Sequence, residues 1–333
     1  MSTDIIKNLK KILEGLDNPK LSENDIAKFK YYLDKIEDKS NEILTVKNLK
    51  KEYTEKEELQ KQKSFNGLTA SEWARSSKNV WNDLSSPRNT KHLVHGATYS
   101  LKLAERVIKN YSKEGDLVFD PFLGTGTTLL AGKALNRSGI GIELVKKFFK
   151  FSKELLETKD LISYEQKVFN DDCRNLDKYL EDDTVQLTLT SPPYADFIHK
   201  TILDRKTAHK NSALVSKNNS KTKPYSDLKE DFGNLPYDKF LKESKILLEK
   251  IYRKTKPNGY NAWVVKDYRD TKNKIPYIPF HSDLAKIGEE AGFKFHDLIV
   301  WDQNAQRSLI LLGYPSVFYS NQNCSFIVIF RKS

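Results

Sequence analysis

Apolar residues along this chain occur in short runs and in stripes at helical spacing, separated by polar turns. The short runs predict strands, and they lie at 116–120, 139–143, 165–170, 185–190, 260–266, 295–301 and 324–331. The stripes predict helices, and they lie at 100–112, 128–136, 144–156, 237–254 and 281–291. Because strands and helices alternate, the sequence predicts an α/β fold in three layers around a mainly parallel sheet.

The first 64 residues show a different pattern. Apolar residues recur at helical spacing over 5–16 and again over 29–36, and lysine and glutamate dominate from 47 to 63. We therefore predict two parts, a helical N-terminal extension over 1–64 and an α/β domain over 65–333. A solvated scaffold is the favoured role for the extension. Packing on the α/β domain, nucleic-acid contact and self-association are the alternatives.

A polar stretch at about 195–236 interrupts the alternation of strands and helices. Long loops are uncommon unless they are functional or disordered. Over 195–223 only Asp196 and Asp204 are acidic, against the basic residues Lys200, Arg205, Lys206, Lys210, Lys217, Lys221 and Lys223. We predict that this basic insertion binds nucleic-acid phosphates, and a disordered surface loop is the alternative. A second candidate recognition segment is 302–323, whose Gln, Asn and Arg side chains can read base edges.

A glycine-rich loop, Asp120-Pro121-Phe122-Leu123-Gly124-Thr125-Gly126-Thr127-Thr128, follows the first predicted strand of the sheet. The next helix and a short strand ending at Glu143 complete a βαβ unit, which binds cofactors at the carboxyl edge of a sheet. The spacing excludes a dinucleotide fingerprint, which needs glycine at Leu129, and a P-loop, because Ala134 follows Gly132-Lys133. The loop therefore suits a ligand with a ribose and no phosphates, such as S-adenosylmethionine, and Glu143 can accept the ribose hydroxyls.

The predicted strand at 185–190 ends in the tetrapeptide Ser191-Pro192-Pro193-Tyr194. Two consecutive prolines cannot continue a strand ladder, so the backbone must turn there. The turn brings together a hydroxyl, exposed carbonyls and an aromatic ring. Such a group suits a planar ring with an amine, because the oxygens accept the amine hydrogens and the tyrosine stacks on the ring.

Together these motifs resemble the amino-methylating DNA methyltransferases, the N4-cytosine/N6-adenine family. The resemblance covers roughly 65–333, and its pieces are the glycine loop, Gly141-Ile142-Glu143-Leu144, Asp171-Asp172-Cys173, Thr190-Ser191-Pro192-Pro193-Tyr194 and His95-Gly96-Ala97-Thr98-Tyr99. A tetrapeptide that begins with serine is typical of N4-cytosine enzymes, whereas adenine enzymes more often begin with Asp or Asn. In many serine-type members the tetrapeptide precedes the glycine loop, whereas here it follows. This order leaves the position of the target-recognition segment open.

The resemblance implies an S-adenosylmethionine-dependent methyltransferase (Rossmann-like) fold whose last two strands are antiparallel. It implies methyl transfer to the exocyclic N4 of cytosine in double-stranded DNA after base flipping, within a restriction-modification system and beside a cognate restriction endonuclease. N6-adenine methylation at the same site is the alternative, and a non-catalytic DNA-binding module is a further one. RNA or protein-glutamine methylation is less favoured, because those relatives usually begin the tetrapeptide with Asp or Asn.

The resemblance also assigns roles to single residues. In the catalytic tetrapeptide, the Ser191 hydroxyl and the Pro192 carbonyl accept the amine hydrogens, Pro193 shapes the turn and Tyr194 holds the ring. Glu143 binds the ribose, and Asp172, with Asp171 as the alternative, binds the adenine amine. The full set of expected cofactor-binding residues is Thr98, Asp120, Pro121, Phe122, Gly124, Gly126, Thr127, Glu143, Asp171 and Asp172.

The charge and hydropathy of the chain indicate which partners and which cellular location to expect. The net charge is +11, and 1–64 contributes little of it, with 14 basic against 13 acidic residues. The basic excess therefore lies in 65–333, where a nucleic-acid-binding surface is expected. The chain has no apolar run long enough to span a membrane and no signal-peptide pattern, so we expect a cytoplasmic protein without a membrane partner.

Two chemistries are disfavoured. Carbon-5 cytosine methylation needs a cysteine nucleophile, and neither Cys173 nor Cys324 adjoins the tetrapeptide in sequence. The two cysteines also provide no disulfide framework. His92 and His95 are neighbours without clustered partner ligands, so no metal site is expected.

Overall fold

A computed structural model describes residues 9, 23–84, 99–157, 164–193, 226–270, 273–306 and 318–333, without the side chains of 23–25, 40, 42–49 and 53. The chain divides into two compact units, Met1–Lys63 and Ser64–Ser333. Each unit is described by itself.

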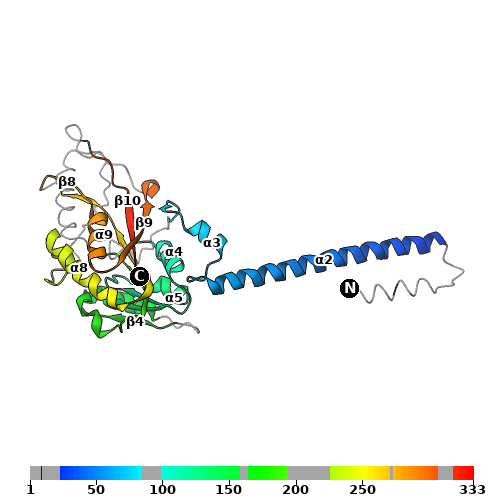
Figure 1. The fold of residues 1–333 in the computed structure, drawn as a ribbon, viewed down its shortest axis with the longest axis horizontal. Coiled ribbons are helices and arrows are strands. Elements are labelled where there is room, and N and C mark those ends of the chain that lie inside the picture. Colours follow the sequence, from blue (N-terminus) through cyan, green and yellow to red (C-terminus); the bar gives the residue numbers. More distant parts are fainter. Residues whose placement is uncertain are drawn as a thin grey trace. The chain divides into compact units, whose positions relative to one another are not determined.

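The first unit contains a long helix, α2 (Glu23–Lys63), of 41 residues (Figure 1). Of the apolar stripe predicted over 29–36, Phe29, Tyr32 and Ile36 are exposed and Leu33 is buried. Charged side chains of opposite sign one turn apart, such as Lys51 and Glu55 at 3.9 Å, are typical of an exposed helix surface.

The second unit is built on an eight-stranded sheet within the described part of the chain. Its strands are β1 (Val80–Trp81), β2 (Leu117–Asp120), β3 (Ser138–Ile142), β4 (Gln166–Phe169), β5 (Val185–Thr190), β6 (Thr255–Val265), β9 (Lys294–Asp302) and β10 (Cys324–Arg331). The order is β1-β9-β10-β6-β5-β2-β3-β4, and only β10 runs antiparallel to its neighbours. The predicted mixed α/β fold with a mainly parallel sheet is confirmed, as is the antiparallel pairing of the last two strands.

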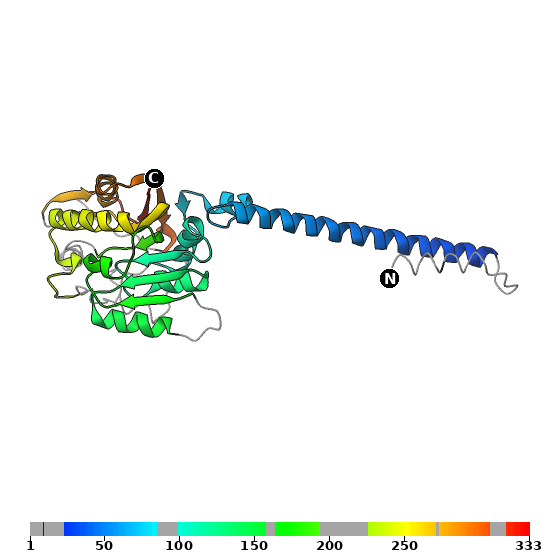
Figure 2. The same cartoon turned by 60° about the horizontal axis from the view of Figure 1, so that its bottom comes forward.

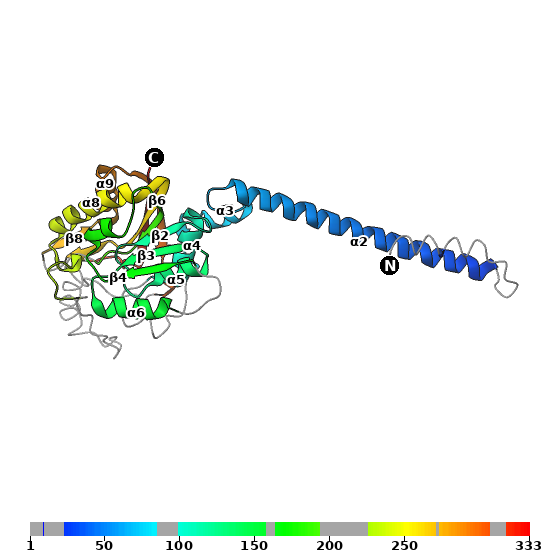
Figure 3. The same ribbon diagram turned by 90° about the horizontal axis from the view of Figure 1, so that it is seen from below.

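Helices cover both faces of the sheet, as Figures 2 and 3 show. On one face lie α4 (Leu101–Tyr111), α5 (Thr127–Ala134) and α6 (Lys146–Leu156), and on the other lie α8 (Tyr237–Lys254) and α9 (Phe280–Glu290). Neighbouring strand residues divide between two buried clusters: Val264 packs toward α4, whereas Trp263 and Val265 pack toward α8 and α9. Burial on both faces explains why the central strands appear as continuous apolar runs in the sequence.

Three short strands and four short helical elements of the described residues were not predicted, among them the 3₁₀ helices η2 (Cys173–Lys178) and η4 (Asn304–Gln306). β1 adds an edge strand parallel to β9, and Trp81 at its end is 1% exposed. β7 (Tyr268–Asp270) and β8 (Ile275–Ile278) form a separate antiparallel hairpin. The helix α3 (Ala70–Ser76) has a capping box from Thr69, and the 3₁₀ helix η3 (Phe232–Asn234) lies within the predicted insertion. Strands and helices this short carry too few residues to show a periodicity.

Parallel strands place their carboxyl ends at one edge of the sheet, where the loops after β2, β3, β4 and β5 meet. Most of the predicted site residues lie on these four loops. Among the described helices, none is both long enough and apolar enough to cross a membrane.

Candidate cofactor and substrate site

One cavity lies at the carboxyl edge of the sheet, with about 670 Å³ of space that is partly open to solvent. Its walls come from the ends of β2, β3, β4 and β5 and from a segment before α8. The lining residues are Pro121, Phe122, Gly124, Glu143, Leu144, Val145, Phe148, Asp172, Cys173, Ser191, Pro192, Pro193, Glu230, Asp231 and Phe232.

The glycine loop is fastened to the end of β3 by Glu143. The Gly124 N–H donates to one oxygen of the Glu143 carboxylate at 2.7 Å, and the Val145 N–H donates to the other at 2.7 Å. Gly126, which precedes α5, has a φ of +88°, a backbone conformation that favours glycine. Each carboxylate oxygen has a second lone pair, so Glu143 can hold the loop and still accept a hydroxyl of a ligand.

Asp120 lies under the loop and binds other parts of the protein. It is 2% exposed and accepts from the Phe122 N–H at 3.0 Å and the Thr190 hydroxyl at 2.6 Å. Thr128 and Tyr99 also donate to its second oxygen. Asp120 therefore joins β2, the glycine loop, α5 and β5. It lies outside the cavity lining, so its position fits that of a residue that orients the loop.

Burial changes the protonation of both acids. Loss of solvent raises the pKa of Glu143 to about 7 and the pKa of Asp120 to about 6, although hydrogen bonds to each carboxylate oppose the shift. The Asp120 and Asp231 charges raise the pKa of Glu143 further.

Stability should consequently depend on pH through Glu143. Its folded pKa lies above the unfolded value, so its contribution to stability is present below about pH 4 and is lost as the pH rises through about 7. Between pH 4.5 and 7.5, the free energy of unfolding should fall by roughly 3 kcal/mol more in the wild type than in Glu143→Gln, which has no carboxyl group to titrate at this position. Urea unfolding at a series of pH values measures this difference, and Glu165→Gln, an exposed acid, is the control. Parallel curves for wild type and Glu143→Gln would contradict the prediction.

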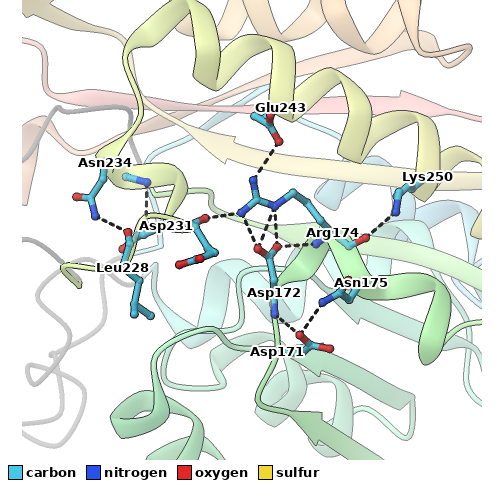
Figure 4. Close-up of polar contacts among 11 residues, drawn as sticks. Asp171, Asp172, Arg174, Asn175, Leu228, Asp231, Asn234, Glu243 and Lys250 are labelled. Atoms are coloured by element: carbon cyan, nitrogen blue, oxygen red, sulfur yellow. Dashed lines mark hydrogen bonds and ion pairs between the residues drawn. The ribbon is translucent and has the colours of Figure 1, made fainter.

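The two acids after β4, Asp171 and Asp172, lie in different surroundings. Asp172 lines the cavity, and Arg174 binds its carboxylate through Nε and Nη2 at 2.6 to 3.0 Å (Figure 4). Asp171 accepts from Asn175, Tyr179 and Lys178 and lies outside the lining. Of the two acids, the geometry therefore favours Asp172 as the ligand of an adenine amine.

Arg174 connects Asp172 to the segment before α8. Its guanidinium also donates to Glu243 at 3.1 Å and to the Glu230 carbonyl at 2.8 Å, and it lies 5.3 Å from the centre of the Phe232 ring. Glu230 and Phe232 line the cavity, and the Phe232 ring packs edge to face on Phe122 of the glycine loop, with ring centroids 5.1 Å apart. One side chain thus fixes two walls of the cavity.

Removal of the Arg174 guanidinium should lower both the free energy of unfolding and the affinity for S-adenosylmethionine. Hydrogen bonds to charged groups contribute more than neutral ones, but 28% of the Arg174 side chain is exposed and solvent screens part of the gain. We expect Arg174→Met to lower the free energy of unfolding by about 1–2 kcal/mol. Arg174→Lys should recover only part of it, because lysine lacks the planar fork. Urea unfolding and calorimetric titration with S-adenosylmethionine test this. Lys178→Met, which removes an ion pair to Asp171 from a side chain that is 60% exposed, is the matched control; an equal loss in both variants would contradict the prediction.

The tetrapeptide follows β5 directly. Ser191, Pro192 and Pro193 line the cavity that Glu143 and Gly124 also line, although more than 45 residues separate them from the glycine loop in sequence. β5 pairs in parallel with β2, so both strands deliver their loops to the same edge. The hydroxyl and the proline carbonyl are thereby placed beside the space where a cofactor would lie.

The predicted site residues fall into three groups. Lining the cavity are Pro121, Phe122, Gly124, Glu143, Asp172, Ser191, Pro192 and Pro193. Outside the lining are Asp120, Gly126, Thr127 and Asp171. Outside the described residues are Thr98, Tyr194 and the basic set Lys200, Arg205, Lys206, Lys210, Lys217, Lys221 and Lys223, with His92 and His95.

Several lining residues were not predicted. Leu144 and Val145 directly follow Glu143 and precede α6, and Phe148 lies in the first turn of that helix. The apolar positions after the acid were therefore an available signal. Glu230, Asp231 and Phe232 lie within the stretch assigned to the basic insertion, where nothing in the sequence marks them. Phe232 and Leu235 are buried in the main apolar cluster, so the end of the predicted insertion is a wall of the cavity.

Cys173 lines the same cavity as Ser191, from which it is separated in the sequence. The sequence argument that no cysteine adjoins the tetrapeptide is therefore incomplete. Burial raises the pKa of the Cys173 thiol well above its usual value, and the thiolate is the nucleophilic form. The chemistry still disfavours carbon-5 methylation.

In the second predicted recognition segment, 302–323, some of the described polar residues are buried or bonded within the fold. Gln303 is 4% exposed and Asn323 is 7% exposed, and their backbones are hydrogen-bonded to each other at 2.9 Å. Asn304 turns its amide to Asp302. Among the described residues of 302–323, Gln303 and Asn323 are thus poor candidates for reading base edges.

The lining has a distinctive charge. Among the residues that the structure describes, it contains the acids Glu143, Asp172, Glu230 and Asp231 and no lysine, arginine or histidine. Such a cavity repels phosphates and favours a ligand that carries positive charge and hydroxyls. S-adenosylmethionine, with a sulfonium, an ammonium and a ribose, fits this donor set. Within the described residues, no three His, Cys, Asp or Glu side chains are grouped to hold a metal ion.

Comparison with known proteins finds local similarity to one family. The model of a family described as DNA methylase, the N6/N4 methylases, matches residues 16–154, which include the glycine loop and Glu143. The Type II methyltransferase M.MthZI of Methanothermobacter thermautotrophicus is 45% identical over 84 residues, 24% of this chain and 22% of that protein. M.HpaI of Haemophilus parainfluenzae is 49% identical over 57 residues, 17% of this chain and 18% of that protein.

These matches are local. The Type II methyltransferase M.BglI of Bacillus subtilis is 37% identical over 94 residues, 28% of this chain and 26% of that protein. The chain thus spans only about a fifth to a quarter of the length of these relatives. A solved S-adenosylmethionine-dependent methyltransferase of Methanosarcina mazei superposes with a TM-score of 0.40 at 13% identity, over 68% of this chain and 96% of that one. So loose a superposition adds nothing to the similarity seen in the sequences. On its motifs and these local sequence matches, the chain is similar to the N6/N4 family of DNA methylases.

Proposed function

We propose that this protein transfers a methyl group from S-adenosylmethionine to the exocyclic N4 of cytosine in double-stranded DNA. The observation that carries the proposal is the shared cavity: Ser191, Pro192 and Pro193 line the same space as Glu143 and the glycine loop. A methyl donor and an amine acceptor must meet in one place, and this cavity offers binding groups for both.

The residues of the chain would act by binding and orientation. Glu143 accepts the ribose hydroxyls, and Asp172 accepts the adenine amine. S-adenosylmethionine supplies an electrophilic methyl group on a sulfonium. The amine of cytosine is a poor nucleophile because its lone pair is delocalised into the ring. When the Ser191 hydroxyl and the Pro192 carbonyl accept hydrogen bonds from its two N–H groups, electron density returns to nitrogen. The amine would then attack the methyl carbon in line as the methyl–sulfur bond breaks, and the nitrogen would release one proton to solvent.

The target amine is paired and stacked inside duplex DNA, so the base must be flipped out of the helix, at a cost of a few kcal/mol. We propose that the basic residues between 195 and 223 hold the phosphates during this step, which makes DNA binding sensitive to salt. Tyr194 would then stack on the extruded ring.

The N4 assignment rests on the serine that begins the tetrapeptide, because the same acceptors could serve adenine N6. We further propose a restriction-modification setting with a cognate endonuclease acting on the same DNA site, because the relatives compared are named Type II methyltransferases. A cytoplasmic location stays a prediction.

The test is a nucleoside analysis. Purified protein is incubated with unmethylated DNA and S-adenosylmethionine that carries a labelled methyl group, and the DNA is digested for mass spectrometry. Labelled N4-methylcytosine supports the proposal. Labelled N6-methyladenine moves the assignment to adenine with the same site. No labelled nucleoside from several DNA sources, despite cofactor binding, overturns the proposal, and RNA is the next substrate to test.

A further inference from the structure

Asp231 is a buried acid in the cavity that takes no part in the proposed methyl transfer. It lines the cavity, next to Phe232, and is 4% exposed. It was not among the residues expected from the sequence, and it lies about 40 positions after the tetrapeptide.

The Asp231 carboxylate is held firmly but by neutral groups. The Gly233 N–H donates to one oxygen at 2.8 Å, and the Ser226 hydroxyl donates to the other at 2.6 Å. Asp231 also caps the short helix η3, and Figure 4 shows it on the segment next to Arg174. Among the described residues, no lysine, arginine or histidine forms an ion pair with it. Arg174 pairs with Asp172 and Glu243 instead.

A buried carboxylate without a cation is costly to a protein unless something compensates its charge. The Arg174 guanidinium partly neutralises the charge of the Asp172 carboxylate in the lining. Glu143 and Asp231, in contrast, repel each other, and the negative charge of Asp231 contributes to the raised pKa of Glu143. A cationic ligand would relieve this repulsion, and a neutral ligand of the same shape would not.

We infer that Asp231 makes the cavity prefer the positively charged methyl donor over the product that forms when the methyl group leaves. This inference rests on the proposed function. The transfer converts the sulfonium of S-adenosylmethionine into the thioether of S-adenosylhomocysteine, so the ligand loses one unit of positive charge. A fixed negative charge in a cavity of limited solvent access therefore stabilises the substrate complex more than the product complex. Asp231 is a specificity-determining residue that favours exchange of spent cofactor for fresh.

The experiment compares three ligands on wild type and Asp231→Asn by calorimetric titration. The ligands are S-adenosylmethionine, S-adenosylhomocysteine and sinefungin, an analogue with an ammonium in place of the methyl sulfonium. Asparagine keeps an oxygen for the Gly233 N–H and an amide that can pair with the Ser226 hydroxyl, so the local fold should persist. Asp227→Asn, the same charge change at an exposed position outside the lining, is the matched control.

We expect Asp231→Asn to weaken binding of the two cationic ligands about tenfold, equivalent to about 1.4 kcal/mol, with S-adenosylhomocysteine unchanged within about twofold. Asp227→Asn should change none of the three. An equal loss for all three ligands, or an unchanged ratio of the cationic to the neutral ligands, overturns the inference alone. Wild-type protein that binds none of the three overturns the proposed function and this inference with it. Thermal unfolding of each variant shows whether a loss comes from damage to the fold.

Discussion

Replacement of Ser191 by alanine should lower the rate of methyl transfer by about 10²–10³-fold while leaving cofactor affinity unchanged within about twofold. In the proposed mechanism, the serine hydroxyl is one of two oxygens at the end of β5 that accept hydrogen bonds from the amine. Without it, only the Pro192 carbonyl would shift electron density onto nitrogen. The proposed cofactor contacts of Glu143 and Asp172 come from other strands and should persist.

Single-turnover kinetics with saturating DNA measure the rate, and calorimetric titration measures cofactor affinity. Ser77→Ala, an exposed serine outside the cavity lining, is the matched control and should keep the wild-type rate. Full activity in Ser191→Ala would remove the hydroxyl from the mechanism. A parallel loss of cofactor binding would instead place Ser191 among the cofactor ligands.

Asp120→Ala should cost about 3–5 kcal/mol of the free energy of unfolding, which is the largest stability effect we expect in the site. The carboxylate is buried, and it accepts hydrogen bonds from Phe122, Thr190, Thr128 and Tyr99. Alanine would leave these donors without an acceptor in the interior, and each unpaired group carries its own desolvation penalty. The glycine loop would also lose its anchor, so cofactor affinity should fall with stability.

Urea unfolding at pH 7.5 and titration with S-adenosylmethionine test both effects. Asp120→Asn is the graded control, because its amide oxygen can still accept from Phe122 and Thr190. We expect it to lose less than half as much stability as alanine does. A cost below about 1 kcal/mol for Asp120→Ala would show that the network contributes little.

Local sequence patterns predicted most of the regular structure. β5 and α8 have the predicted bounds, and α4, α5, β2 and β3 differ by one or two residues at an end. These elements are long or bury apolar residues on both faces, so their periodicity is evident without tertiary information. The start of β6 was missed, because Thr255–Gly259 is polar and contains a proline.

The candidate site likewise contains residues that the sequence could place and residues that it could not. The glycine loop, Glu143 and Ser191 could be placed at one edge of the sheet from sequence alone, because each follows a predicted parallel strand. Asp171 and Asp172 could not be distinguished, since both follow β4. Their side chains differ in the groups that they contact. Asp172 is bound by Arg174, which also contacts Glu230 and, on α8, Glu243, whereas Asp171 is bound by Asn175 and Tyr179.

The sequence by itself thus determined the order of strands and helices, the family resemblance and the residues that directly follow the central strands. Those features depend on local periodicity and on short motifs, which are complete within a few residues. Only the tertiary structure decided that Asp120 is a buried anchor, that Cys173 lies in the cavity wall and that Asp231 faces Glu143 across about 90 positions of sequence. These relations arise from packing between distant segments, and no local pattern in the sequence records which buried group a side chain meets.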